Sequence, residues 1–191
     1  MAPQVSYLEE MAVLLKNLVE KILLESEKII FTGESTVERK DLIEYDRRMR
    51  ASGTDKFNYP AFVAAVNYYR NEREKMQHNA CGALILYIRA SAVDSILKNM
   101  GIRKYDDENE EEVAGKCADI CLSLAEKFNK ELMGAGYREL VLSQAIGAKN
   151  SIMQGVEFSY DQYDRYEIGF SQSKEKVMVL DLTMTAIPRS Y

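Results

Sequence analysis

The chain has 191 residues but only one histidine and three cysteines. Transition-metal centres are built from several His and Cys ligands, so His78 alone predicts no metal site. Cys81, Cys117 and Cys121 lie within apolar patterns, which is typical of reduced, buried thiols in a cytosolic protein. A serine or cysteine nucleophile would have only His78 as its base, and it lies in no nucleophile motif. We therefore expect no metal, no cofactor and no such covalent catalysis.

Long apolar runs, an export signal and a basic patch are also missing. No window of 18 apolar residues occurs, which predicts no membrane span. Acidic residues stand in the first 11 positions, where a signal peptide would need lysine or arginine, so we expect a cytoplasmic protein. The net charge of −5 gives no electrostatic footprint for nucleic acid. No glycine-rich phosphate loop of the GxxxxGK[ST] type is present either.

The dominant positive feature is a helix predicted over residues 109–133. An acidic run precedes it, where the helix dipole favours negative charge, and Gly134 follows as a stop signal. Apolar residues recur at three- and four-residue steps and so share one face: Val113, Cys117, Ile120, Cys121, Leu124, Phe128 and Leu132. The opposite, outer face carries Gly115, Asp119, Leu122, Glu126, Asn129 and Met133. We expect the functional site on that outer face.

The other segments predict both helices and strands. Residues 5–30 form an amphipathic helix, and the polar segment 34–58 favours a short helix over 37–49. Two apolar runs predict strands over 62–69 and 80–88, although the period of the first also allows a helix, and a short helix follows over 90–100. Beyond residue 138 the period changes to two, which predicts strands over 139–145, 155–160, 166–171 and 177–185. Alternation in the last of these indicates one buried face.

Together these elements predict an α+β domain. We expect about six mostly antiparallel strands in one sheet, with the long central helix and its neighbouring helices packed on it. Residues 59–191 would form this domain. Residues 1–58 would add the N-terminal helix and a charged insertion packed on the same domain.

The order of elements resembles the CheC/CheX/FliY family of chemotaxis phosphatases. The likeness spans residues 62–184: a glycine-containing strand (82–86) leads into a short helix, an acidic segment opens the long helix, and a strand of the type LSQA follows. The resemblance implies a CheX-like fold and a site of the form Glu-x-x-Asn on the outer face of the long helix, with a proline 23 positions after the asparagine. In that family the glutamate pairs with a lysine of the response regulator CheY, and the asparagine orients the water that attacks its phosphate. Any Mg²⁺ would belong to the response regulator.

Two registers of this motif are open in the sequence. In the first, Asp119 and Leu122 occupy the motif, and 23 positions after Leu122 comes Ala145, on the LSQA strand where the family has proline. In the second, Glu126 and Asn129 form a literal Glu-x-x-Asn, but 23 positions on lies Ile152, past that strand. The first register fits the fold better and the second fits the chemistry better. We favour the first, in which leucine offers neither a donor nor an acceptor for water.

Three functions follow from these alternatives. The favoured prediction is a CheX-like domain that engages a phosphorylated receiver domain through Asp119, Leu122, Glu126, Asn129 and Ala145, with weak or no phosphatase activity. The second is an active aspartyl-phosphate phosphatase that uses Glu126 for docking and Asn129 to position water. The third is a scaffold or dimerisation protein that uses Leu122 and Met133 as an apolar patch. A homodimer paired through sheet edges is also expected from the resemblance.

Overall fold

One antiparallel sheet organises the fold. The computed structural model describes residues 6–25, 31–42, 44–45, 48–49, 54–150, 155–157 and 162–190. In these residues a seven-stranded sheet has the order β1-β8-β9-β5-β4-β6, and β7 also pairs with β4. Its strands are β1 (Thr36–Asp41), β4 (Ala61–Tyr69), β5 (Gly82–Arg89), β6 (Val141–Leu142), β7 (Ile146–Lys149), β8 (Asp164–Gln172) and β9 (Glu175–Met184). A separate short ribbon pairs β2 (Glu44–Tyr45) with β3 (Arg48–Met49).

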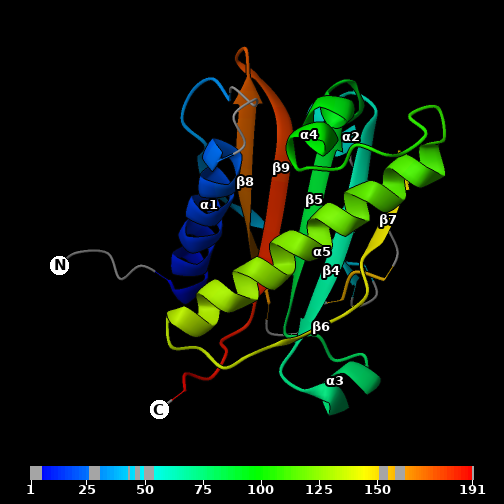
Figure 1. The fold of residues 1–191 in the computed structure, drawn as a ribbon. Helices are drawn as coiled ribbons and strands as arrows, with labels where there is room; N and C mark the ends of the chain where they lie inside the picture. Colours follow the sequence, from blue (N-terminus) through cyan, green and yellow to red (C-terminus); the bar gives the residue numbers. More distant parts are fainter. Residues whose placement is uncertain are drawn as a thin grey trace.

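The main helices lie on one face of this sheet. Figure 1 shows the long helix α5 (Glu110–Gly134) crossing that face diagonally, with α1 (Tyr7–Glu25) and α4 (Val93–Asn99) on the same side. The remaining short helices are α2 (Thr54–Phe57), α3 (Glu72–Met76) and the 3-10 turn η1 (Ala90–Ala92). The predicted α+β class is confirmed, with seven strands where about six were expected. Within the described part of the chain, no helix is both long and apolar enough to cross a membrane.

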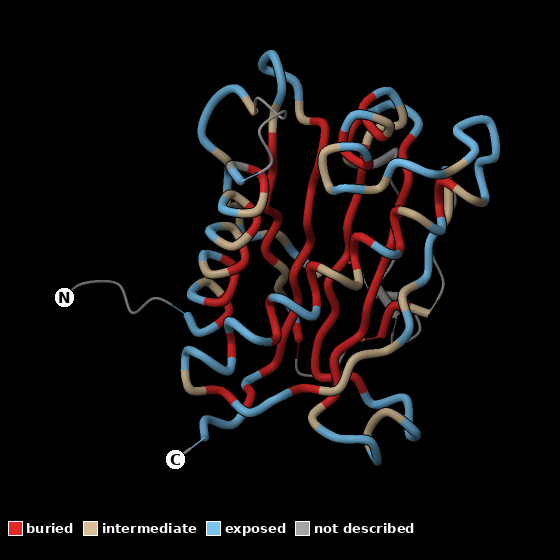
Figure 2. Tube along the Cα trace, in the orientation of Figure 1, coloured by how far each residue is buried: buried red, intermediate tan, exposed pale blue. Residues whose placement is uncertain are grey.

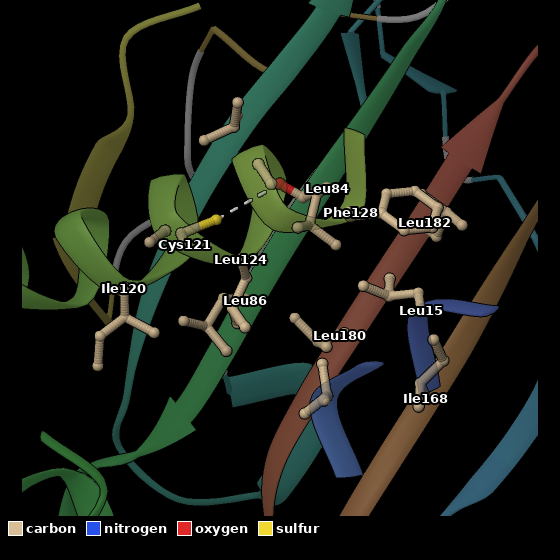
Figure 3. Close-up of a cluster of buried hydrophobic side chains, with 14 of the residues drawn as sticks. Leu15, Leu84, Leu86, Ile120, Cys121, Leu124, Phe128, Ile168, Leu180 and Leu182 are labelled. Carbon is tan, nitrogen blue, oxygen red and sulfur yellow. Dashed lines mark hydrogen bonds between the residues drawn. The ribbon is translucent and has the colours of Figure 1, made fainter. Parts of the chain in front are cut away.

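The larger core lies between α5 and the sheet. Leu124 and Phe128 of α5 face Leu84, Leu86, Leu180 and Leu182 of the two central strands (Figure 3). The thiol of Cys121 lies 3.8 Å from the carbonyl oxygen of Leu84. Burial raises the pKa of Cys121 to about 12, so the thiol is neutral and unreactive at physiological pH. The expectation of buried, free cysteines is confirmed for all three.

The other face of the sheet is covered as well. Val63, Ile85 and Val179 form a second apolar cluster with Phe57 of α2 and Val156. Figure 2 shows that the middle strands are buried along most of their length. The prediction that the last strand has only one buried face is therefore wrong. Its alternation reflects different neighbours on the two faces, α5 and α1 on one and α2 with residues 155–157 on the other.

A charged cluster occupies part of this second face. Asp181 of β9 is only 1% exposed and accepts hydrogen bonds from Tyr87 (3.0 Å), Arg165 (2.8 Å) and Lys56 (3.0 Å). Lys56 also lies 2.6 Å from a carboxylate oxygen of Glu167 on β8. Buried charges are tolerated when they are paired in this way. The cluster thus joins α2, β5, β8 and β9.

Two of the predicted elements differ in the structure. The helix expected over 37–49 is wrong in its described residues, because residues 36–41 form β1 and pair with β8 from Thr36↔Gly169 to Asp41↔Asp164. Pairing with a distant strand outweighs the local helical preference of this segment. The strand expected over 139–145 reduces to β6 and is followed by β7. The strand expected over 155–160 is not formed in its described residues, 155–157. Its remaining residues, 158–160, and the last residues of the helix expected over 5–30, namely 26–30, lie outside the described part of the chain.

Candidate functional site

The helix that carries the predicted site is firmly placed at its N-terminus. Asn109 is the N-cap, and its side-chain oxygen accepts hydrogen bonds from the backbone amides of Glu111 (3.1 Å) and Glu112 (3.2 Å). Acidic residues fill the first turn, where the helix dipole favours them. Lys149 of β7 pairs with Glu110, so the edge of the sheet holds the same end. The outer face of α5 is thus presented on a rigid element.

The outermost line of α5 carries Asp119, Glu126 and Met133. These residues recur at seven-residue steps, and all three are exposed. The side chain of Asp119 is 63% exposed and lies 3.5 Å from Lys116, an exposed ion pair that contributes little to stability. The carboxylate of Asp119 is therefore available to a cation of a partner. Glu126 lies about 10 Å further along the same line, at 1.5 Å per residue.

Asn129 does not lie on the outer face, and that expectation is wrong. Asn129 is only 6% exposed. The side-chain amide donates to the carbonyl oxygen of Leu140 (2.8 Å), and its oxygen accepts from the Leu140 backbone amide (3.0 Å). Asn129 is rotated by about 60° from the outermost line of the helix, at 100° per residue, and the chain after α5 packs against that flank. A helical wheel cannot show which flank a later segment will cover.

Leu122 lies on the same flank of α5 as Asn129, seven residues before it. A β-carbon on Gly147 would come within 3.3 Å of the β-carbon of Ala118, so β7 passes that point of α5. Leu122 is about one helical turn after Ala118, and Ala145 directly precedes β7. Leu122 and Ala145 are both half-buried and pack against the large core.

This placement bears on the two registers. In the structure, the first register combines an exposed carboxylate, Asp119, with a half-buried leucine, Leu122. The second brings an exposed carboxylate, Glu126, together with an amide already hydrogen-bonded at both ends. Neither presents a free amide on the outer face. Among the residues that the structure describes, no group of three His, Cys, Asp or Glu side chains could hold a metal ion.

Sequence analysis missed the residues on the opposite flank of α5. Ser123 and Lys127 line a cleft there together with Asp119 and Ile120, and residues of α1 and of the α4 end complete its walls. Ser123 and Lys127 continue from Asp119 at four-residue steps, which was the only signal in the sequence. What the sequence could not supply was the position of α1 and α4 beside this stripe.

Comparison with known proteins places the fold. No protein-family profile matches the sequence, and no curated protein matches it. Solved structures do match. Chemotaxis protein CheX from Vibrio vulnificus has a TM-score of 0.55 at 12% identity, covering 92% of this chain and 99% of that one. A CheC-like superfamily protein from a Shewanella species gives 0.53 at 15% identity, with 91% and 99% coverage.

A third structure is a complex. CheX from Borrelia burgdorferi, solved with CheY, BeF₃ and Mg²⁺, gives a TM-score of 0.54 at 11% identity and covers 96% of this chain and 100% of that chain. At such identities the likeness establishes the fold. The chain has the CheX-type fold, and the resemblance to the CheC/CheX/FliY family is confirmed at that level.

Proposed function

We propose that this protein binds a phosphorylated response-regulator receiver domain through the outer face of α5 and does not accelerate loss of its phosphate. The observation that carries the proposal is the exposed carboxylate of Asp119 on the long helix of a CheX-type fold. A CheX from another organism forms a complex with CheY, which supports a receiver domain as the partner. The process served would be chemotaxis or another two-component pathway in the cytoplasm.

Asp119 would act as the docking group. An exposed carboxylate on a rigid helix can pair with a lysine of the receiver, the role that the family gives to its glutamate. Aspartate is one methylene shorter than glutamate, so the partner must approach the helix more closely for the same ion pair. Glu126, about 10 Å further along the exposed line, supplies a second acid at the edge of the contact.

The lack of hydrolysis follows from Leu122. Hydrolysis of a phosphoryl group depends on positioning the attacking water, and a leucine side chain has no group that can hydrogen-bond to it. Asn129 is remote from this role while its amide is bonded to Leu140. The competing phosphatase hypothesis requires those two hydrogen bonds to break.

A binding and turnover experiment tests the proposal. The receiver domains of the source organism are phosphorylated and mixed with the wild-type protein or with Asp119→Lys. We expect saturable binding of one receiver by the wild type, loss of phosphate at the receiver's own rate, and binding weakened at least about tenfold by Asp119→Lys, because like charges then face each other. An increased rate of phosphate loss would instead support the phosphatase hypothesis with Glu126 and Asn129.

Absence of binding to every receiver would overturn the proposal and favour the scaffold hypothesis. In that case Leu122 and Met133 would be expected to contact a second copy of the chain. Replacing exposed Met133 with Lys would then reduce self-association measured by light scattering, whereas Lys130→Ala on the neighbouring turn would not. The predicted homodimer through sheet edges stays a prediction.

A further inference from the structure

A cleft lies beside the proposed docking face, on the flank of α5 that faces α1 and α4. Its α5 wall is the stripe Asp119, Ser123 and Lys127 together with Ile120. The apolar remainder comes from Ile22 of α1 and from Met100 and Ile102 just after α4. In Figure 1 the two helices stand on the same side of α5, opposite the side along which β7 runs.

The size and lining of the cleft exclude most small-molecule ligands. Its volume is about 180 Å³. Small-molecule and cofactor sites have roughly 300 to 1,000 Å³ and enclose most of their ligand. A cleft of this size, open to solvent and partly lined by isoleucine and methionine residues, suits one apolar side chain from a protein partner.

The charges at its two ends indicate which chemistry fits. Asp119 lies at one end and Lys127 at the other, about 12 Å apart along the helix axis, with Ser123 between them. Ser123 is small and half-buried, and buried Ile120 contributes to the cleft lining beside it. A matching surface therefore presents a cation, then an apolar side chain, then a carboxylate, at steps of about 6 Å.

We infer that the receiver domain seats one apolar side chain in this cleft, between a lysine paired with Asp119 and an acidic residue facing Lys127. The inference rests on the proposed function, because Asp119 belongs both to the docking face and to the cleft wall. On this inference, the cleft determines which receiver domains can bind. The carboxylate of Asp119 can attract many basic surfaces, whereas the cleft and Lys127 admit only those with the further two groups in place.

Filling the cleft tests the inference. The probes are the receiver domains of the source organism, loaded with beryllofluoride and Mg²⁺, titrated against the wild type and the variants Ser123→Trp and Lys130→Trp. Lys130 is exposed on the same side of α5, about two turns further along and outside the cleft, so it controls for a bulky residue on this helix. We expect Ser123→Trp to weaken binding at least about tenfold and Lys130→Trp to leave it within about twofold.

A charge variant makes the test independent of cleft filling. Lys127→Glu is expected to lower affinity about threefold at low ionic strength, with a smaller effect at high salt, because the contact at that end is electrostatic.

Thermal unfolding of each variant checks that it is folded, and if Ser123→Trp does not fold, Lys127→Glu decides the matter. If Ser123→Trp and Lys127→Glu bind like the wild type while Asp119→Lys does not, the docking function stands and the cleft inference is overturned. If the wild type binds no receiver, the proposed function fails, and the inference fails with it.

Discussion

At the scale of single residues, Asn129 matches a functional motif in the sequence but has a structural role in the fold. Its sequence context, Glu-x-x-Asn, matches the family's motif literally. In the structure, however, its side-chain amide hydrogen-bonds to both the carbonyl oxygen and the backbone amide of Leu140. A buried backbone amide and carbonyl need partners, and the loop after α5 finds both in one side chain. The residue therefore fixes the chain that leads from the helix to β6.

Replacing Asn129 with alanine tests this structural role. Two buried backbone groups of Leu140 lose their partners, and we expect the free energy of unfolding to fall by about 2 to 3 kcal/mol, measured by denaturant titration. Glu126→Ala, three residues away and exposed, should change it by less than about 0.5 kcal/mol. An Asn129→Ala protein as stable as the wild type would show that the amide is not needed for folding and would reopen its use at the surface.

At the scale of elements, the close contact between α5 and β7 shapes the site. Gly147 has no side chain, and a β-carbon there would come 2.3 Å from the carbonyl oxygen of Ala114, which is too short for any real contact. The strand can therefore approach the helix only with glycine at this position. The same approach holds β7 against the flank of α5 that carries Ala118.

Gly147→Ala should accordingly separate β7 from α5. We expect a loss of about 1 to 3 kcal/mol in the free energy of unfolding, since the obstructing atom belongs to the backbone and cannot rotate away. Gly115→Ala on α5 is the matched control, because a β-carbon there meets nothing within 4 Å. It should stabilise the protein by up to about 1 kcal/mol through helix propensity. Equal effects of both substitutions in thermal unfolding would contradict this account.

The elements also show what the sequence could and could not predict. The long helix, the strands β4 and β5 and the hairpin of β8 and β9 follow from strong apolar periods, and they were predicted to within a few residues. Residues 36–41 are charged or polar apart from Val37, so nothing local distinguishes their pairing with β8 from a solvated helix. For the site, the exposed positions of Asp119 and Glu126 were predictable from the wheel. The burial of Asn129 was not, because the segment that covers it comes later in the chain.

At the scale of the whole molecule, the charged cluster links stability to pH. Burial alone would raise the pKa of Glu167, but hydrogen bonds and charges from Lys56 and Lys176 outweigh it and lower the pKa from 4.5 to about 2. A carboxyl whose pKa is lower in the folded state stabilises that state fully above its unfolded pKa. The contribution is lost as the pH falls from about 4.5 towards 2.

Glu167→Gln should therefore make the stability of the protein less dependent on pH in the acidic range. We expect the difference in melting temperature between pH 5 and pH 3 to be smaller in this variant than in the wild type, measured by calorimetry across that range. At neutral pH the variant should be less stable, because the buried ion pair between Lys56 and Glu167 is then lost. Parallel pH profiles for the two proteins would contradict the assignment.

The place of β9 in the sheet has a consequence for how the chain is made. β9 lies between β8 and β5, and its residues Leu180 and Leu182 face the long helix. It follows every other strand of the described sheet in chain order, so a growing chain carries α5 with its apolar face only partly covered until β9 has left the ribosome. β1 likewise cannot pair until β8 has been synthesised, more than a hundred residues later, because Thr36 of β1 pairs with Gly169 of β8. Such long-range pairings are slow to form and leave apolar surface exposed to other chains in the meantime. Nascent chains of this protein that stop before residue 175 should therefore depend on chaperones, whereas chains that extend past residue 184 should not.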